Sequence, residues 1–213
     1  MLFLLSKVLI IKLKYTFDLI LDMVGNLANF TKIDVLRCLL RIEKPVSRSE
    51  LSETLNLGEG TIRSILDILK KNNFLESNKK GHYLSQKGNN IVKKIRSKID
   101  IKEIDLAGVF PDKKKIAADI RNPKIISKSH IVLRDVAVKN GADGALILNY
   151  DGKLKVSDFD EEQDFKDIEN KFDLNKNDIV VVAYADSYKL AEHGALAIAV
   201  ELNNGLKEIM QKF

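Results

Sequence analysis

The sequence predicts a two-domain protein of the α+β or α/β class, in which a small helical module precedes a sheet domain. Helix-capping signals, helical apolar spacing and a short hairpin follow one another within residues 45–88. Strand-like and helical segments then alternate in residues 101–213. The charge divides in the same way: residues 31–100 hold 15 Lys and Arg against 8 Asp and Glu, whereas residues 101–213 hold 17 against 20. Such asymmetry is expected where only one half of a protein meets a polyanion.

Three helices are predicted in residues 30–72. The first covers residues 30–42 and ends before Pro45, which disfavours helical geometry in the residue ahead of it. Ser47 and Glu50 have the spacing of a capping box, so the second helix should begin near residue 48 and end at Leu57-Gly58. The third should run from residue 59 or 60 to 72, because apolar residues recur there at helical spacing, namely Ile62, Ile65, Leu66 and Leu69.

A hairpin and a fourth helix are predicted next. Residues 74–84 contain two short strand-like pieces joined by a turn at residues 77–81, which holds Asn and Gly and carries two lysines. Ser85 should cap a helix over residues 86–99. Its apolar stripe either closes the core of the module or pairs with the same helix of a second subunit, and it consists of Ile91, Ile95 and Ile99.

This order of elements predicts a winged helix-turn-helix, a nucleic-acid-binding module. The segment Gly60-Thr61-Ile62-Arg63-Ser64 and the hairpin ending in Tyr83-x-Leu-Ser-x-Lys-Gly resemble those of prokaryotic winged-helix transcription regulators over about residues 30–99. The whole chain resembles archaeal winged-helix proteins with an uncharacterised C-terminal domain. The resemblance implies that the helix starting near residue 60 enters the major groove and that the hairpin tip contacts phosphates. The predicted DNA-binding residues are Arg48, Thr61, Arg63, Ser64, Lys70, Lys79 and Lys80.

The sequence pattern of residues 101–213 predicts a sheet of four or five strands that is covered by helices. Residues 178–185 form a near-continuous apolar run, which is typical of a central strand. A helix over residues 129–140 should turn Val132, Leu133, Val136 and Ala137 inward and stop at Gly141. The remaining expected elements are a strand at 114–120, a hairpin at 145–157 turning at Asp151-Gly152, an acidic helical stretch at 158–172 and a final helix to about residue 202.

No catalytic pattern is visible in the sequence. It lacks a glycine-rich phosphate loop, a nucleophile elbow and metal-ligand spacing, so we expect no enzyme activity, no cofactor and no metal. The acidic run at 158–164 lacks the spacing of a calcium loop, and a solvated face is the simpler interpretation. The candidate effector-binding residues stand at strand ends: Asp119, Arg121, Asp186 and Ser187. The simpler interpretation is a helix cap for Asp186 or Ser187 and a surface or ion-pair residue for Arg121.

Residues 1–29 form an apolar N-terminal extension. Lys7, Lys12 and Asp18 interrupt the apolar run, which argues against a membrane span or a secretory signal. Two interpretations stay open: a helix that packs on the protein, or an extension outside the native chain if synthesis starts at Met23. The single cysteine, Cys38, lies in an apolar helical setting that favours a buried filler over a redox switch, and it fits a cytoplasmic location.

The function predicted from these observations is transcription regulation. Residues 30–100 would read double-stranded DNA, and residues 101–213 would bind a small-molecule effector or form a homodimer, with no membrane partner. Two other classes stay open: a protein–protein interaction module of transcription or another information-processing complex, and, less favoured, an enzyme with a winged-helix appendage.

Overall fold

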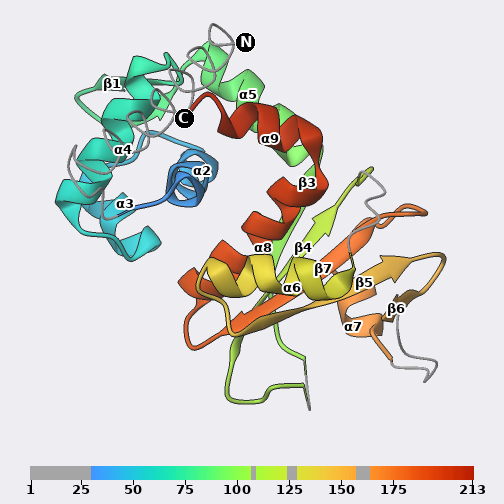
Figure 1. Cartoon of the computed structure of the whole chain (residues 1–213). Coiled ribbons are helices and arrows are strands. Elements are labelled where there is room, and N and C mark those ends of the chain that lie inside the picture. The colour runs from blue at the N-terminus through green and yellow to red at the C-terminus, as the bar shows by residue number, and fades with distance from the viewer. Residues whose placement is uncertain (1–29, 107–108, 124–128, 157–163) are drawn as a thin grey trace, which may run out of the picture. The chain divides into compact units, whose positions relative to one another are not determined.

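The computed structural model describes residues 30–106, 109–123, 129–156 and 164–213. Within it, the first part of the chain folds into a helical module (Figure 1). Three helices, a two-stranded hairpin and a fourth helix follow one another, in the order predicted. They are α2 (Lys32–Arg41), α3 (Arg48–Leu55), α4 (Glu59–Lys71), β1 (Leu75–Asn78), β2 (Gly81–Leu84) and α5 (Gln86–Arg96).

Local capping sets the helix boundaries of this module. The Ser47 side chain accepts a hydrogen bond from the backbone N–H of Glu50 at 3.1 Å, so α3 begins where the capping box predicts. It ends at Asn56, which adopts the left-handed conformation with φ 52°. The Ser85 side chain likewise accepts from the N–H of Gly88 at 3.0 Å and caps α5.

The core of the module consists of the apolar residues that the helical spacing selects. All four residues of the α4 stripe are buried, from Ile62 to Leu69. Cys38 is also fully buried, and this burial raises the pKa of its thiol to about 12. The burial confirms the prediction that Cys38 is a buried side chain of the core.

The hairpin is fastened to the start of α3. Its register pairs Leu75 with Leu84 and Asn78 with Gly81. Val46 and His82 exchange two backbone hydrogen bonds of 2.9 and 2.8 Å. Gly81 has φ +125°, and a Cβ there would lie 2.4 Å from the Val46 carbonyl oxygen, so only glycine allows this approach.

The predicted helix over residues 86–99 was too long. Helix α5 ends at Arg96, and Ile99 opens strand β3 (Ile99–Ile104). The alternating apolar residues Ile99 and Ile101 pair with β4 (Lys114–Ile120), and this sheet pairing prevails over the helical repeat that runs through Ile95. The predicted domain boundary between residues 100 and 101 therefore lies inside a strand.

Five strands form the sheet of the second part, in the order β3-β4-β7-β5-β6. The other three are β5 (Gly144–Tyr150), β6 (Leu154–Val156) and β7 (Ile179–Ala185). The predicted central strand is confirmed, since β7 lies between β4 and β5. Every neighbouring pair is antiparallel, so the protein is of the α+β rather than the α/β type. The hairpin turn is also as predicted, with Gly152 at φ +84°.

Helices cover both faces of this sheet. On one face α8 (Tyr188–Leu202) contacts β4 and β7, and α6 (His130–Lys139) contacts β5 and α8. On the other face Phe165, Ile168 and Phe172 pack around the short α7 (Lys166–Glu169), in one apolar cluster with residues of β4, β5 and β7. A further helix that the sequence pattern did not indicate is α9 (Asn204–Met210).

Helix α6 buries less than predicted. Leu133 and Ala137 are buried, but Val132 is 41% exposed and Val136 is only half-buried. Among the described elements α6 packs chiefly on α8 and β5, and these contacts bury the stripe that holds Leu133 and Ala137. The helix stops at Gly141 as predicted, where φ is +95°.

The helical module and the sheet domain, β3 to α9, belong to one compact unit, residues 32–213. The C-terminal Phe213 packs edge-on against Phe74 of the module, with ring centroids 6.1 Å apart. The Lys32 ammonium donates to the carbonyl oxygen of Met210 at 3.3 Å. The C-terminal segment of the sheet domain is thus tied to α2 and to the residue that precedes β1.

Candidate nucleic-acid interface

The outward face of α4 carries four of the predicted DNA-binding residues. Arg63, Ser64 and Lys70 are exposed and Thr61 is half-buried, on the side of the helix opposite to the apolar stripe. Arg63 and Lys70 form no ion pair or side-chain hydrogen bond within the described part of the chain. Their charges are therefore available to an external partner.

Two of the predicted residues are already engaged. Arg48 Nε lies 3.2 Å from Glu59 Oε2 in an exposed ion pair between the starts of α3 and α4. The Ser64 hydroxyl donates to the carbonyl oxygen of Gly60 at 3.3 Å, within its own helix. An exposed pair of this kind contributes at most about 1 kcal/mol, so a phosphate could compete with Glu59 for Arg48.

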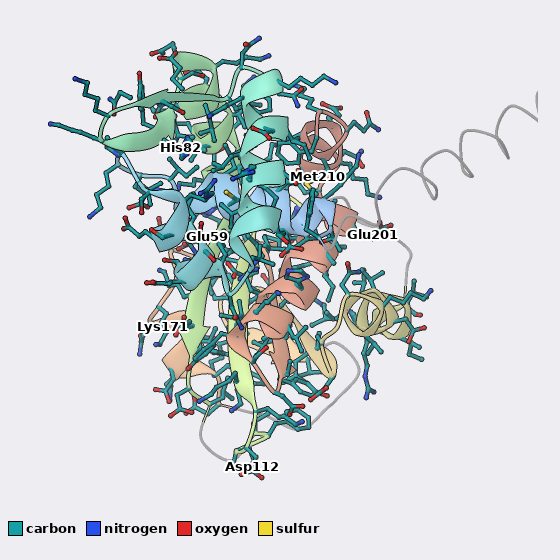
Figure 2. The ribbon with its side chains drawn as sticks, turned by 90° about the vertical axis from the view of Figure 1, so that its left-hand side faces the viewer. Glu59, His82, Asp112, Lys171, Glu201 and Met210 are labelled. Carbon is teal, nitrogen blue, oxygen red and sulfur yellow. The ribbon has the colours of Figure 1, made fainter. Side chains whose placement is uncertain are left out.

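The wing tip, defined here as Lys79 and Lys80, lies in the turn of the hairpin. Both residues are exposed, in the same hairpin as His82, which Figure 2 labels. The backbone N–H of Lys80 donates to Asn78 Oδ1 at 2.7 Å, so an asparagine side chain shapes the turn. The two lysine ammonium groups extend from a turn with a defined backbone.

His82 marks where the hairpin meets the helices, and it was absent from the predicted set. Its Nδ1 lies 2.7 Å from the Ser77 hydroxyl. Its pKa is lowered, chiefly by burial and then by the positive charges of Lys70 and Arg48, while Asp67 opposes them. The charges of Arg48 and Lys70, both predicted DNA-binding residues, therefore act on a side chain of the hairpin.

The predicted effector residues do not form one site. Asp119 is fully buried at the end of β4, where its Oδ2 accepts from Arg121 Nε at 3.1 Å. Its Oδ1 has no hydrogen-bond partner among the described residues. Burial raises the pKa of Asp119 to about 6, with a further contribution from the nearby Asp178, whereas Arg121 lowers it.

Asp186 and Ser187 lie at the opposite end of β4. The sheet register pairs Lys114 with the neighbouring Ala185, at the start of the strand that Asp119 and Arg121 terminate. Asp186 binds Lys113 at 2.6 Å, and Lys113 also binds Asp143 at 2.6 Å. These hydrogen bonds, with Asp143 first, raise the pKa of Lys113.

The Ser187 side chain accepts from the backbone N–H of Leu190 at 3.3 Å and so caps α8. The helix-cap interpretation therefore holds for Ser187 and the ion-pair interpretation for Arg121, whereas Asp186 forms an ion pair with Lys113 instead of capping α8.

A buried polar network that sequence reasoning missed joins α2 to α8. Arg37 binds Glu192 at 2.7 Å and Asp34 at 3.2 Å, and Asp34 binds His193 Nε2 at 2.8 Å. All four side chains are buried. The adjacent polar pair Glu192-His193 within the alanine-rich final helix was the one available sequence signal. The network couples the module that carries the candidate interface to the sheet domain.

The described residues contain no group of three or more His, Cys, Asp or Glu side chains that could hold a metal ion. In the same part of the chain, no helix combines the length and apolar character needed to cross a membrane. The acidic run predicted as a solvated face, residues 158–164, lies outside the described residues except for Asp164.

Two families match this chain. Residues 31–90 match the family described as "PH0730-like, N-terminal domain", and residues 111–202 match the "Domain of unknown function (DUF4443)". Each match spans less than half of the chain and describes a similarity of that segment. The second match agrees with the sequence resemblance to proteins that have an uncharacterised C-terminal domain. A comparison with curated proteins found no match.

Two solved structures are similar to the chain. The "Hypothetical protein PH0730 from Pyrococcus horikoshii OT3" is 27% identical with a TM-score of 0.71, over 85% of this chain and 100% of that chain. The "S. agalactiae BusR in complex with its busAB-promotor DNA" is 14% identical with a TM-score of 0.23, over 81% of this chain and 97% of that chain. The second likeness is too weak for a structural argument, whereas the first extends over both parts of the fold.

Proposed function

We propose that the protein is a DNA-binding transcription regulator that reads double-stranded DNA with α4 and the hairpin, as a winged helix-turn-helix does. One observation carries this proposal. The helical module holds several cationic side chains that form no ion pair within the described residues. Arg63 and Lys70 stand on the outer face of α4, and the wing tip stands on the hairpin. Such cations gain free energy when they displace counterions from phosphates.

In the proposed complex α4 lies in the major groove. Arg63, near the start of α4, contacts a base edge or a phosphate, and a bidentate pair with guanine would discriminate by about 1–3 kcal/mol. The wing tip, Arg48 and Lys70 hold the protein on the backbone. Thr61 and Ser64 line the same approach. Asp67 is the exposed carboxylate on this face, and it limits how closely the middle of α4 approaches phosphates.

Selection of bound fragments from genomic DNA tests the proposal, followed by titration of the best fragment at several salt concentrations. The wild type should bind with a steep salt dependence, and Arg63→Ala should weaken binding to the selected fragment. Lys155→Ala is the matched control, because it removes an exposed cation from the sheet domain. The proposal fails if the wild type selects no fragment, or if its binding does not depend on salt.

The sheet domain is proposed to sense an effector or to hold two copies of the chain together. In a homodimer, two copies of α4 would face successive half-sites, and an effector would bias their spacing. The proposal assigns no reaction, cofactor or metal to the chain, and a cytoplasmic location follows from regulation of DNA. Sedimentation of the full chain, with and without the selected fragment, gives the oligomeric state.

A second candidate function is protein–protein interaction, and one observation favours it. Helix α6 exposes Ile131 by 71%, Val132 by 41% and Val138 by 48%. Apolar side chains gathered on one helix are typical of a surface that binds protein. Two results together would favour this second function over DNA-binding regulation. The wild type would bind no DNA, and it would sediment as a complex that Ile131→Asp dissociates.

A further inference from the structure

A cavity of about 520 Å³ lies where the helical module meets the sheet domain. Its walls come from α2 and α5 on one side and from β3, β4 and α8 on the other. This volume lies within the range of about 300–1,000 Å³ that is usual for small-molecule sites. Junctions between folded parts are also where such sites preferentially occur.

Three guanidinium groups line this cavity, each from a different element. Arg41 belongs to α2, Arg96 to α5, and Arg121 follows β4. Arg41 makes one ion pair, with Glu192 at 3.1 Å, and Arg96 uses only its Nη2 atom, toward Glu43 and a backbone carbonyl. Arg121 uses Nε and Nη1. Each guanidinium therefore retains N–H donors that can bind a carboxylate.

The cavity also holds carboxylates, and one of them is unpaired. Glu43 and Glu192 bind arginines of the cavity, and Asp100 binds Lys102 at 3.0 Å. Glu103, exposed on β3, has no ion partner among the described residues. In the described part of the chain, the lining thus includes one carboxylate without an ion partner and several guanidinium N–H donors that are not used.

The charges of the lining indicate which class of ligand the cavity can bind. Four carboxylates and three guanidinium groups line the cavity, so a simple anion would enter a lining that is already negative. A simple cation would bind Glu103 but leave the arginine donors unused. A zwitterion satisfies both, because its ammonium group can bind Glu103 while its carboxylate binds the arginines.

The rest of the wall is apolar. Ile99, Ile101 and Ile116 contribute from the sheet, and Leu40 contributes from α2. The register pairs Ile99 with Ile120, Ile101 with Ala118 and Ile116 with Glu103, so the three isoleucines share one face of the sheet with Glu103. A ligand with an apolar body would bury surface there.

We infer that this cavity binds a small zwitterion with an apolar body, the chemistry shared by a free α-amino acid and a short apolar peptide. The inference rests on the effector role proposed for the sheet domain and names its ligand class. The carboxylate of Glu192 links the cavity to the buried network, since Oε1 binds Arg41 in the cavity and Oε2 binds Arg37. A ligand that engages Arg41 therefore acts on the contact between α2 and α8.

Calorimetry and thermal unfolding of the full chain without DNA test this inference. The zwitterionic probes are L-leucine, Leu-Leu and Leu-Leu-Leu, whose ranking separates the amino acid from the peptides. The matched single-charge probes are 4-methylpentanoate, which lacks the ammonium group, and 3-methylbutylamine, which lacks the carboxylate. At least one zwitterion should bind and raise Tm, and its single-charge analogues should bind at least about tenfold more weakly, since each loses a charged hydrogen bond.

Two variants locate the site. Glu103→Gln and Arg96→Gln should each weaken the best zwitterion by about tenfold or more. Their controls are Glu53→Gln on α3 and Lys93→Gln on α5, which remove exposed charges outside the cavity. Unfolding without ligand reports whether each variant is folded. The inference is overturned if no zwitterion binds, if a single-charge probe binds equally well, or if both cavity variants bind like the wild type. Because DNA is absent, failure of the regulator proposal would leave these results unchanged.

Discussion

The Nε atom of Arg37 in α2 lies 2.7 Å from Oε2 of Glu192 in α8, and both side chains are buried. The same guanidinium binds Asp34 at 3.2 Å, and Asp34 binds His193 at 2.8 Å. These residues lie more than 150 positions apart in sequence across the two helices. The pair therefore fastens the helical module to the sheet domain.

Arg37→Ala should destabilise the protein strongly. It removes the buried cation that Asp34 and Glu192 share. Glu192 then keeps the half-exposed Arg41, and Asp34 keeps His193. Removing one partner of a buried ion pair typically costs about 3–5 kcal/mol. Urea unfolding measures the change. Arg41→Ala is the control, because Arg41 binds the same Glu192 from a side chain that is 45% exposed and should lose at most about 1 kcal/mol. Equal effects of the two variants would show that the buried pair does not join the domains as described.

Removal of the wing-tip charges should flatten the salt dependence of DNA binding. Each phosphate that is neutralised contributes about 0.9 to the slope of log affinity against log salt concentration, so Lys79→Ala with Lys80→Ala should lower the slope by about 2. Fluorescence anisotropy over a salt series measures it, with Lys155→Ala as the control. An unchanged slope would mean that the hairpin does not contact the backbone.

Asp119 should contribute to the free energy of unfolding of the wild type, and this contribution should decrease as the pH rises from 4 to 6. The pKa of its carboxyl group is raised from 3.8 to about 6 in the folded state, so the folded protein keeps a proton that the unfolded chain releases. Folding stability is therefore lost as pH rises through this window, by an amount on the order of 3 kcal/mol.

Asp119→Asn should remove this contribution. The stability difference between variant and wild type, from urea unfolding at pH 4, 5, 6 and 7, should shift in favour of the variant as pH rises. Asp112→Asn is the control, in the loop that precedes β4 (Figure 2). A difference that stays constant with pH would exclude Asp119 as the source.

Two helical glycines should respond oppositely to alanine. A Cβ at Gly88 would lie 2.1 Å from the carbonyl oxygen of Phe74, so Gly88→Ala must displace backbone and should destabilise by a few kcal/mol. Gly60 has no atom within 4 Å of such a Cβ, and Gly60→Ala should stabilise α4 by up to about 1 kcal/mol. Thermal unfolding compares them. A stable Gly88→Ala variant would contradict the close packing of α5 on the residue before β1.

Much of the fold was predictable because its signals are local. The capping box at Ser47, the apolar stripe of α4 and the turn at Gly152 each act over a few residues, and each prediction was confirmed. Strand β3 was missed because Ile95 and Ile99 also continue a helical repeat. The strand is formed by pairing with β4, whose residues lie about 20 positions further along the chain. A pattern within a short window of sequence does not include that partner.

The residues of the candidate site were likewise predicted where their signals are local, and missed where they depend on contacts between distant segments. Arg63 and the wing tip were found because helix periodicity and turn chemistry expose them. His82 was missed because its contact with the charges of Lys70 and Arg48 depends on how the hairpin folds back. Asp119 and Asp186 were grouped as strand-end residues, but the register places them at opposite ends of β4.

The sequence by itself determined the order of helices and hairpin in the first module, the basic character of that module and the central strand of the sheet, because caps, turns and periodicity operate between near neighbours. Only the tertiary structure decided the antiparallel order of the sheet, the buried pair of Arg37 with Glu192 and the cavity beside it. These features depend on contacts between distant segments, whose geometry is set when the whole core packs.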